Sequence, residues 1–314
     1  MTARLSSSKK KRKFSLLDTL KKYWQLYLLF APVVIWYILF CYEPMTNITI
    51  AFKKFSVIRG IAGSPWVGLK NFEQMFAAPM FWRAFRNTLI MSAQNLVFGF
   101  PAPIIFALLL NELSAPRFKK VVQTISYLPH FISWSVAGGL VYMLLALNTG
   151  TINNIIVALG GQQQNFIGMN SAFRTIVIIS SIWKSLGWSA IVYLAAITGV
   201  DEQLYEAAYI DGATKLDVFR KITIPLSKPI IVYTLLTSFM GPWVDYIYAR
   251  VILGNDRAYY TVAIGLWTML EKEFIEYYYT QFFAGCILIS IPIAALFLFT
   301  QKFYVESVSG AVKG

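Results

Sequence analysis

The feature that most constrains this chain is a set of six apolar runs, each long enough to cross a lipid bilayer. A transmembrane helix needs about 20 predominantly apolar residues to span the hydrocarbon core. Hydrophobic residues make up 57% of the sequence and charged residues only 14%, a balance too apolar for an ordinary soluble domain. The sequence therefore predicts an all-α, polytopic membrane protein with six transmembrane helices, at residues 24–42, 88–110, 121–147, 173–199, 229–253 and 282–303.

Prolines interrupt two of these runs. Pro101 and Pro103 lie in the second run and Pro242 lies in the fifth, where a helix in water would break. Neighbouring spans can accommodate such kinks in a membrane. Kinked spans suit a pathway that opens and closes.

The distribution of basic residues predicts the orientation of the chain. Lysine and arginine concentrate in the tail 1–23, around Arg117 and in segment 201–229, and cytoplasmic loops carry such an excess. We therefore expect both termini and segment 201–229 in the cytoplasm. The net charge of +13 is interpreted as a topology signal that touches anionic lipid, not as nucleic-acid binding. The predicted organisation is a basic tail (1–23), a transmembrane domain (24–304) with a long external loop (43–86), and a C-terminal tail (305–314).

Segment 201–229 is polar, carries helix signals and lies between the fourth and fifth apolar runs. Asp201 is positioned to cap a helix, and Gly212 can adopt the backbone angle that ends it. A second, amphipathic helix is expected at 214–222, with Pro225 ending it. The segment is therefore predicted to form two short helices outside the membrane.

The same segment resembles the EAA loop of ABC importer permease subunits. The resemblance rests on the spacing Glu-Ala-Ala, three residues, Gly, nine residues, Ile-x-x-Pro, and this chain has Ile224 where the family usually has leucine before the proline. Residues 63–76 resemble permeases for complex oligosaccharides, and residues 239–253 resemble permeases of maltodextrin-type systems. The matching loop positions are Glu206, Ala207, Ala208, Gly212, Ile222 and Pro225.

The resemblance implies a type I ABC importer permease that takes up oligosaccharides across a bacterial inner membrane. The implied partners are a second permease subunit, two cytoplasmic ATPase subunits and an extracytoplasmic sugar-binding protein. ATP and magnesium would belong to the ATPase subunits, because this chain has no phosphate-binding loop. Small side chains would let the loop dock into an ATPase cleft and transmit its motion to the fourth and fifth spans. The implied coupling residues are Glu206, Ala207, Ala208, Asp211, Gly212 and Ala213.

The residues offer no catalytic centre, metal site or cofactor site. His130 is the one histidine, and no second His or Cys lies near it in the sequence to complete a metal site or a nucleophile pair. Cys41 and Cys286 fall in predicted spans and are expected to be buried thiols. The chain is therefore expected to be a permease and not an enzyme.

A carbohydrate pathway needs aromatic faces for sugar rings and polar groups for hydroxyls. Lys184 and Asp245 lie within apolar runs, where charges normally face protein or water. They are interpreted either as pathway residues or as structurally paired side chains, and no contact between the two is predicted. The external loops are expected to dock the binding protein. The pathway candidates are Asn95, Trp183, Lys184, Trp188, Trp243, Asp245 and Tyr246.

Two other classes of protein stay open at this point. A sugar carrier or channel driven by an ion gradient would work without ATP, but few intramembrane carboxylates are present to couple ions or protons. A membrane enzyme acting on lipid-linked sugars would need a catalytic carboxylate or metal cluster at one interface, and the sequence shows none.

Overall fold

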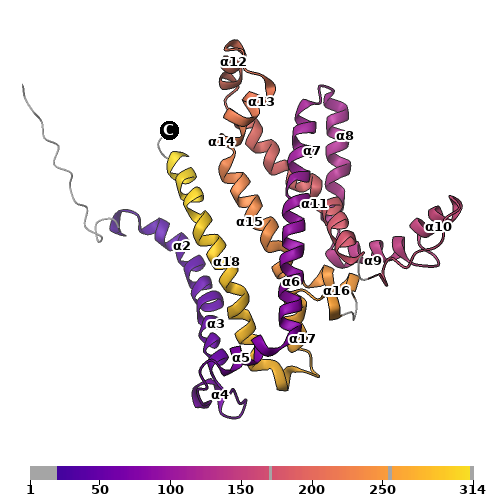
Figure 1. The fold of residues 1–314 in the computed structure, drawn as a ribbon. Coiled ribbons are helices and arrows are strands. Elements are labelled where there is room, and N and C mark those ends of the chain that lie inside the picture. Colours follow the sequence, from indigo (N-terminus) through magenta and orange to yellow (C-terminus); the bar gives the residue numbers. More distant parts are fainter. Residues whose placement is uncertain (1–19, 170–171, 254–256, 312–314) are drawn as a thin grey trace, which may run out of the picture.

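The computed structural model describes residues 20–169, 172–253 and 257–311, with side chains described up to residue 302. Every secondary-structure element of these residues is helical, apart from an isolated β-bridge between Lys53 and Trp66. The all-α prediction is confirmed (Figure 1). Of the predicted tails, residues 1–19 and 312–314 lie outside the described residues.

The helices are joined in several places by short π or 3-10 turns, so one membrane crossing can contain several labelled elements. In chain order they are α2 (Trp24–Tyr37), α3 (Glu43–Met45), α4 (Gly60–Gly63), α5 (Lys70–Ala77), α6 (Pro79–Gln94), α7 (Pro101–Glu112), α8 (Pro116–Tyr127), α9 (Trp134–Leu145), α10 (Thr151–Ala158), α11 (Phe173–Thr198), α12 (Glu202–Ile210), α13 (Lys215–Val218), α14 (Ile224–Leu226), α15 (Lys228–Val244), α16 (Ile247–Leu253), α17 (Val262–Met269) and α18 (Ile275–Ala311).

Four continuous helical paths in the described chain are long and apolar enough to cross a membrane, and the number reaches six when each of two bent pairs is one span. The first path, Trp24–Phe52, and the second, Pro79–Glu112, extend further than predicted. Pro101 and Pro103 directly follow a π turn at Asn95–Gly99, in which the Phe100 N–H bonds to the Asn95 carbonyl, and this wider turn accommodates the prolines within one continuous helical path. The fourth span, α11, agrees with the prediction.

The third predicted span is bent and the fifth is divided, so neither is one continuous helix over the predicted residues. In the third span, α8 and a 3-10 turn meet α9 at 102°. Ile132 and Ser133 are extended there, and Ser133 accepts a hydrogen bond from the Val136 N–H at 3.2 Å, which starts α9 as a new helix. The sequence pattern missed this break because apolar residues continue on both sides of it.

The fifth apolar run also divides. α15 ends at Val244, and the separate helix α16 follows an extended Asp245. The Asp245 carboxylate accepts a hydrogen bond from the Tyr248 N–H at 3.2 Å, as an N-terminal cap does. Residues 247–253 therefore form a helix of their own and not the end of a transmembrane helix.

The core lies where α16 packs against α9, beside α11. Met91, Phe173, Tyr248 and Ile264 are buried in its largest cluster and come from four different helices. α11 also packs along α7, and α15 lies between α6 and α18. These contacts hold the second, fourth, fifth and sixth spans together as one body.

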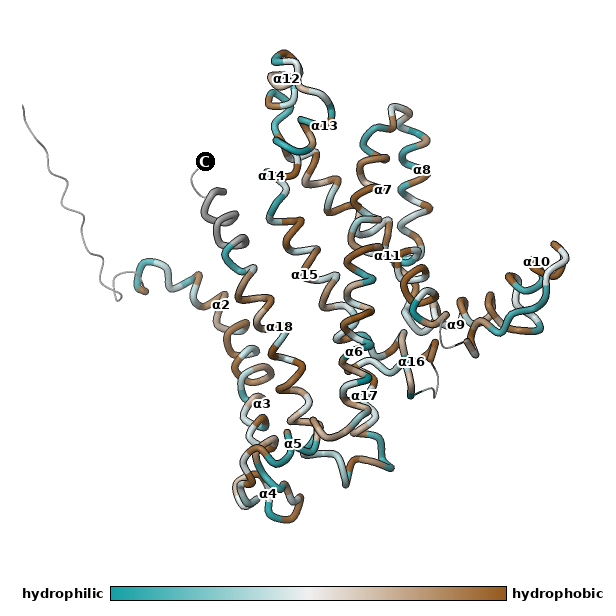
Figure 2. Tube along the Cα trace, in the orientation of Figure 1, coloured by the Kyte–Doolittle hydropathy of each residue, from teal (hydrophilic) through white to brown (hydrophobic). Residues whose placement is uncertain are grey.

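Much of the apolar surface stays uncovered by this chain. No residue of α2 is buried, and most residues in the apolar part of α18 are only partly buried. Figure 2 shows hydrophobic residues along both helices. Exposed apolar surface on this scale marks contact with lipid or with another protein. In Figure 1, α12 and α13 lie at one end of the molecule and α4 and α5 at the other.

Candidate coupling and pathway sites

Segment 201–229, called here the coupling segment, begins with the predicted cap. The Asp201 side chain accepts a hydrogen bond from the Gln203 N–H at 3.0 Å and starts α12. Gly212 has a φ of +79°, a backbone angle that side chains with a Cβ rarely adopt, and it turns the chain after α12. Thr214 and Asp217 then form a capping box at the start of α13. The two-helix prediction is confirmed for this part of the segment.

The predicted end of the second helix is wrong. The helical path continues from α13 through a π turn at Phe219–Thr223 into α14, and it passes Pro225 before it ends at Ser227. In the π turn, the Ile224 N–H bonds to the Phe219 carbonyl, five residues back. This wider turn accommodates a proline that would clash with a regular α-helix.

The coupling segment presents a surface that combines small and apolar side chains. Ala207 is exposed, and Ala208 and Ala213 are half-buried. Ile210 is 85% exposed at the end of α12, and sequence reasoning did not select it. Glu206 is exposed and forms no ion pair with any described residue, so its carboxylate is available to a partner. The other exposed members of the implied coupling set are Asp211 and Gly212.

An ion pair connects the coupling segment to the second span. Lys215 Nζ lies 2.8 Å from Glu112 Oε2 at the end of α7, and both side chains are largely exposed. Because solvent screens exposed pairs, this contact contributes little stability. It does place the start of α13 beside the connection between α7 and α8, a proximity that no sequence spacing indicates.

Lys184 joins the fourth span to the break in the third. Its side chain is only 4% exposed, and Nζ donates a hydrogen bond to the His130 carbonyl at 2.9 Å. The same atom lies 4.6 Å from the centre of the Trp134 ring, within cation–π range. The ammonium therefore satisfies a carbonyl that the broken helix leaves without a partner. Gly187 permits the close approach, because a Cβ there would lie 2.3 Å from the Ser126 carbonyl oxygen.

The other candidates on α11 are aromatic and exposed. Trp188 is 44% exposed and stacks on His130, with ring centres 4.4 Å apart and planes inclined by 5°. Trp183 is also 44% exposed, and it lines an apolar groove between α9 and α11. The structure therefore groups Trp188 with Lys184 at the break in the third span, while Trp183 faces a different groove.

The remaining candidates gather around the end of the fifth span. Pro242 has no N–H to donate to the Ser238 carbonyl, four residues back, and Asn95 Nδ2 donates to that carbonyl at 2.7 Å instead. Trp243 is buried among aliphatic and aromatic side chains. The Tyr246 ring lies 5.2 Å from that of Trp267, and Asp245 caps α16. No ion pair between Lys184 and Asp245 occurs in the described structure.

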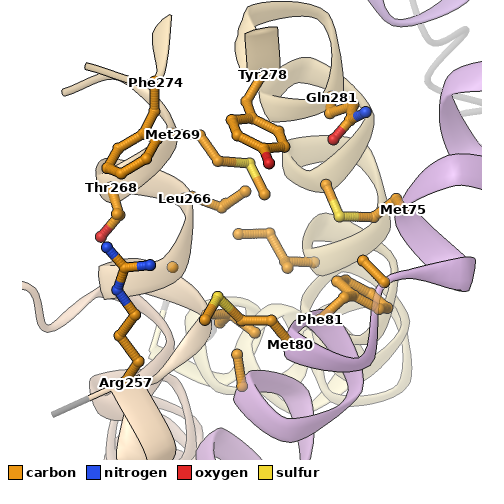
Figure 3. Close-up of a pocket in the computed structure, with 15 residues that line it drawn as sticks. Met75, Met80, Phe81, Arg257, Leu266, Thr268, Met269, Phe274, Tyr278 and Gln281 are labelled. Atoms are coloured by element: carbon orange, nitrogen blue, oxygen red, sulfur yellow. The ribbon is translucent and has the colours of Figure 1, made fainter. Parts of the chain in front are cut away.

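An apolar pocket of 180 Å³ lies beside α5 and was not anticipated from the sequence. Figure 3 shows side chains from α5, α6, α17 and α18 around it, with Arg257 at one side. Met75, Met80 and Met269 contribute flexible thioether side chains to its lining. Nothing in its lining resembles a catalytic group. In the described part of the chain, no three His, Cys, Asp or Glu residues lie close enough to hold a metal ion.

Comparison with known proteins identifies this arrangement of helices. Residues 74–310, which include the coupling segment, match the family model described as "Binding-protein-dependent transport system inner membrane component". The chain belongs to this family. The match covers more than half of the chain and includes the coupling segment. The helical fold and the transport role are therefore those of this family. The expectation that the chain is a permease and not an enzyme is confirmed with it.

Among its relatives, the permease is 46% identical over 228 residues to the polygalacturonan/rhamnogalacturonan transport system permease protein YteP of Bacillus subtilis, covering 73% of this chain and 71% of that one. It is 38% identical over 249 residues to protein LplB of the same organism, covering 79% and 78% of the two chains. A chain in the crystal structure of a bacterial alginate ABC transporter, in complex with an alginate pentasaccharide-bound periplasmic protein, superposes with a TM-score of 0.79. That match is 33% identical and covers 91% of this chain and 95% of the other.

Proposed function

We propose that this permease forms half of the membrane pathway of an ABC importer that takes up oligosaccharides from an extracytoplasmic sugar-binding protein. The main observation behind this proposal is the coupling segment. It is a capped helix pair that presents small and apolar side chains at the end of the fourth and fifth spans. The relatives support the substrate class, because their names refer to polygalacturonan, rhamnogalacturonan and alginate.

In the proposed mechanism, α12 docks into a cleft on a cytoplasmic ATPase subunit. Ala207 and Ala208 permit close approach, Ile210 adds apolar contact, and Glu206 meets a basic group or backbone N–H groups of the partner. ATP and magnesium act on that partner. The coupling segment is covalently continuous with α11 and α15, so closure of the ATPase dimer would tilt the fourth and fifth spans between inward-facing and outward-facing positions.

The remaining parts of the importer follow from the same proposal. The coupling segment and both termini would lie in the cytoplasm of a bacterium, and the external loops would meet the binding protein. The uncovered apolar surface of the first and last spans supports a second permease subunit beside this one, with lipid around the pair. One chain with this many spans encloses only part of a channel, which is a second reason to expect that subunit.

Isolation of the tagged chain from its native membrane in mild detergent, followed by mass spectrometry of the bound proteins, tests the proposal. We expect a second permease and an ATPase that contains a phosphate-binding loop. Uptake of oligosaccharide by the reconstituted assembly should require ATP and the binding protein. Recovery of the chain alone, with sugar uptake that survives ATP depletion, would instead support an ion-driven carrier.

A further inference from the structure

The apolar pocket beside α5 has no part in the proposed coupling or in the pathway. Its volume of 180 Å³ is close to that of a dry apolar cavity of about 150 Å³ that binds benzene. Its walls come from α5, α6, α17 and α18, as Figure 3 shows, and they include Met75, Phe81, Leu266 and Met269. Because these walls offer few partners for hydroxyl groups, the pocket suits a segment of hydrocarbon chain and not a sugar.

Aromatic side chains beside the pocket place it at the level of the membrane surface. Phe81 lines the pocket, and its ring centre lies 5.9 Å from that of Phe76 and 5.4 Å from that of Trp82. Trp82 is 51% exposed, and Trp267 on α17 is 53% exposed. Tryptophan is enriched where the acyl chains of a bilayer meet the headgroups. The first methylenes of a membrane lipid therefore lie at the level of this pocket.

One basic side chain lies at the side of the pocket. Arg257 is exposed, and its guanidinium carbon lies 5.5 Å from the centre of the Phe274 ring, which also lines the pocket. This cation–π contact holds the guanidinium at the pocket. Arg257 forms no ion pair with any described residue, while Glu271 pairs with Arg250. The guanidinium is therefore available to an anion, and its planar set of N–H donors matches a phosphate group.

We propose that this pocket binds one acyl chain of an anionic phospholipid, whose phosphate contacts Arg257. The apolar walls take the chain, and the flexible thioethers of Met75, Met80 and Met269 adapt to its shape. α6 belongs to the second span and α18 to the last, so the bound lipid connects two spans that are far apart in the sequence. This inference goes beyond the proposed importer function and does not depend on which substrate is carried.

Photo-crosslinking in proteoliposomes tests the lipid site. The assembled importer is reconstituted in phosphatidylglycerol that contains a trace of the same lipid with a diazirine near the carboxyl end of one acyl chain. After illumination, mass spectrometry maps the adducts. We expect adducts on the pocket-lining residues of α17, in addition to adducts on α2, none of whose residues is buried by this chain. The adducts on α2 report general contact with lipid and serve as the internal reference.

Gly265→Leu is designed to fill the pocket. A Cβ at Gly265 would meet only the Ala84 Cβ, at 3.8 Å, so a longer side chain can enter the space without a close contact at its base. The adducts on α17 should fall to background while those on α2 stay unchanged. Gly139→Leu is the matched control, because Gly139 is an exposed glycine of α9 with nothing within 4 Å of an added Cβ. It should leave the labelling of α17 unchanged.

Arg257→Gln tests the contact with the headgroup and changes only an exposed side chain. In bilayers of phosphatidylcholine with increasing phosphatidylglycerol, half-maximal labelling of α17 should require about fivefold more phosphatidylglycerol than in the wild type. This factor corresponds to roughly 1 kcal/mol for one basic residue near an anionic surface. Arg59→Gln is the matched control, since Arg59 is an exposed arginine directly before α4, at the same end of the molecule as α5 (Figure 1). It should leave the lipid dependence unchanged.

Three results would overturn the proposal. Labelling of α2 without labelling of α17 would show that no acyl chain enters the pocket. Labelling of α17 that Gly265→Leu does not reduce would show that the reagent reaches only the outer surface of that helix. An equal dependence on phosphatidylglycerol in the wild type and in Arg257→Gln would remove the headgroup contact. Uptake of oligosaccharide in the same vesicles tests the importer function separately, so either proposal can fail without the other.

Discussion

The hydrogen bond from Asn95 to the Ser238 carbonyl predicts a measurable energetic coupling between the second and fifth spans. Pro242 cannot donate to that carbonyl, so Asn95→Ala leaves it without its partner at 2.7 Å. Leaving such a group unpaired costs about 1–3 kcal/mol in water-soluble proteins. Hydrogen bonds between membrane helices contribute roughly 0.6 kcal/mol on average and up to about 1.7 kcal/mol. We expect Asn95→Ala to lower the free energy of unfolding by about 1 kcal/mol, between these limits.

The second half of this prediction is a double-mutant cycle with Pro242→Ala. An alanine at this position supplies the missing N–H, so the Ser238 carbonyl can bond within its own helix. In the Pro242→Ala background, Asn95→Ala should then lower the free energy of unfolding by about half as much or less. The double-mutant cycle isolates this difference as a coupling energy between the two positions. SDS-induced unfolding in mixed micelles, followed by tryptophan fluorescence, measures the four free energies.

A control and a refuting result complete this test. Asn154→Ala removes an exposed amide on α10 and should change the free energy of unfolding by less than about 0.5 kcal/mol. An equal cost for Asn95→Ala with proline and with alanine at position 242 would show that the hydrogen bond does not compensate for the proline. Asn95 would then return to its sequence-based interpretation as a pathway residue.

Three further predictions concern the coupling segment and the broken third span. Glu206→Lys should insert normally in the membrane yet lower both ATP-driven uptake and substrate-stimulated ATPase activity, and unchanged values of both would exclude Glu206 from coupling. Gly212→Ala should destabilise the segment by roughly 1 kcal/mol, because the φ of +79° strains any residue with a Cβ, and limited proteolysis between α12 and α13 should become faster. Lys184→Met should cost about 1–3 kcal/mol by leaving the His130 carbonyl unpaired, while Lys184→Arg should retain part of the stability; equal melting temperatures for wild type and Lys184→Met would contradict the assigned contact.

Local signals in the sequence predicted the coupling segment well. Asp201 caps α12 and Gly212 turns the chain, because capping and left-handed backbone angles depend on the chemistry of single residues. Pro225 was assigned wrongly, because the π turn that accommodates it leaves no mark in a periodic pattern. The coupling role of Glu206 and its neighbours stays a prediction, since its test requires the ATPase.

The candidate pathway residues show where sequence reasoning reached its limit. Lys184 and Asp245 were selected as charges within apolar runs, and the structure gives each a local partner: a carbonyl for Lys184 and a helix N-terminus for Asp245. Asn95 compensates for a proline on another span. The partners of Lys184 and Asn95 are brought near by packing between helices, so neither could be inferred from positions along the chain, whereas Asp245 caps the helix that directly follows it. Trp134 was overlooked because apolar periodicity does not reveal which aromatic rings lie at a break.

The sequence by itself determined the class of this protein: helices that cross a membrane, a polar helix pair between the fourth and fifth spans, and membership of a transport family. These properties follow from hydrophobicity summed over about 20 residues and from short motifs, both of which are local. Only the tertiary structure decided that the third and fifth spans break, that α16 packs into the core, and that Trp188 stacks on His130 beside the break in the third span. The physical reason is that a helix in a membrane breaks where other helices supply partners for the freed backbone groups, as Lys184 and Asn95 do here.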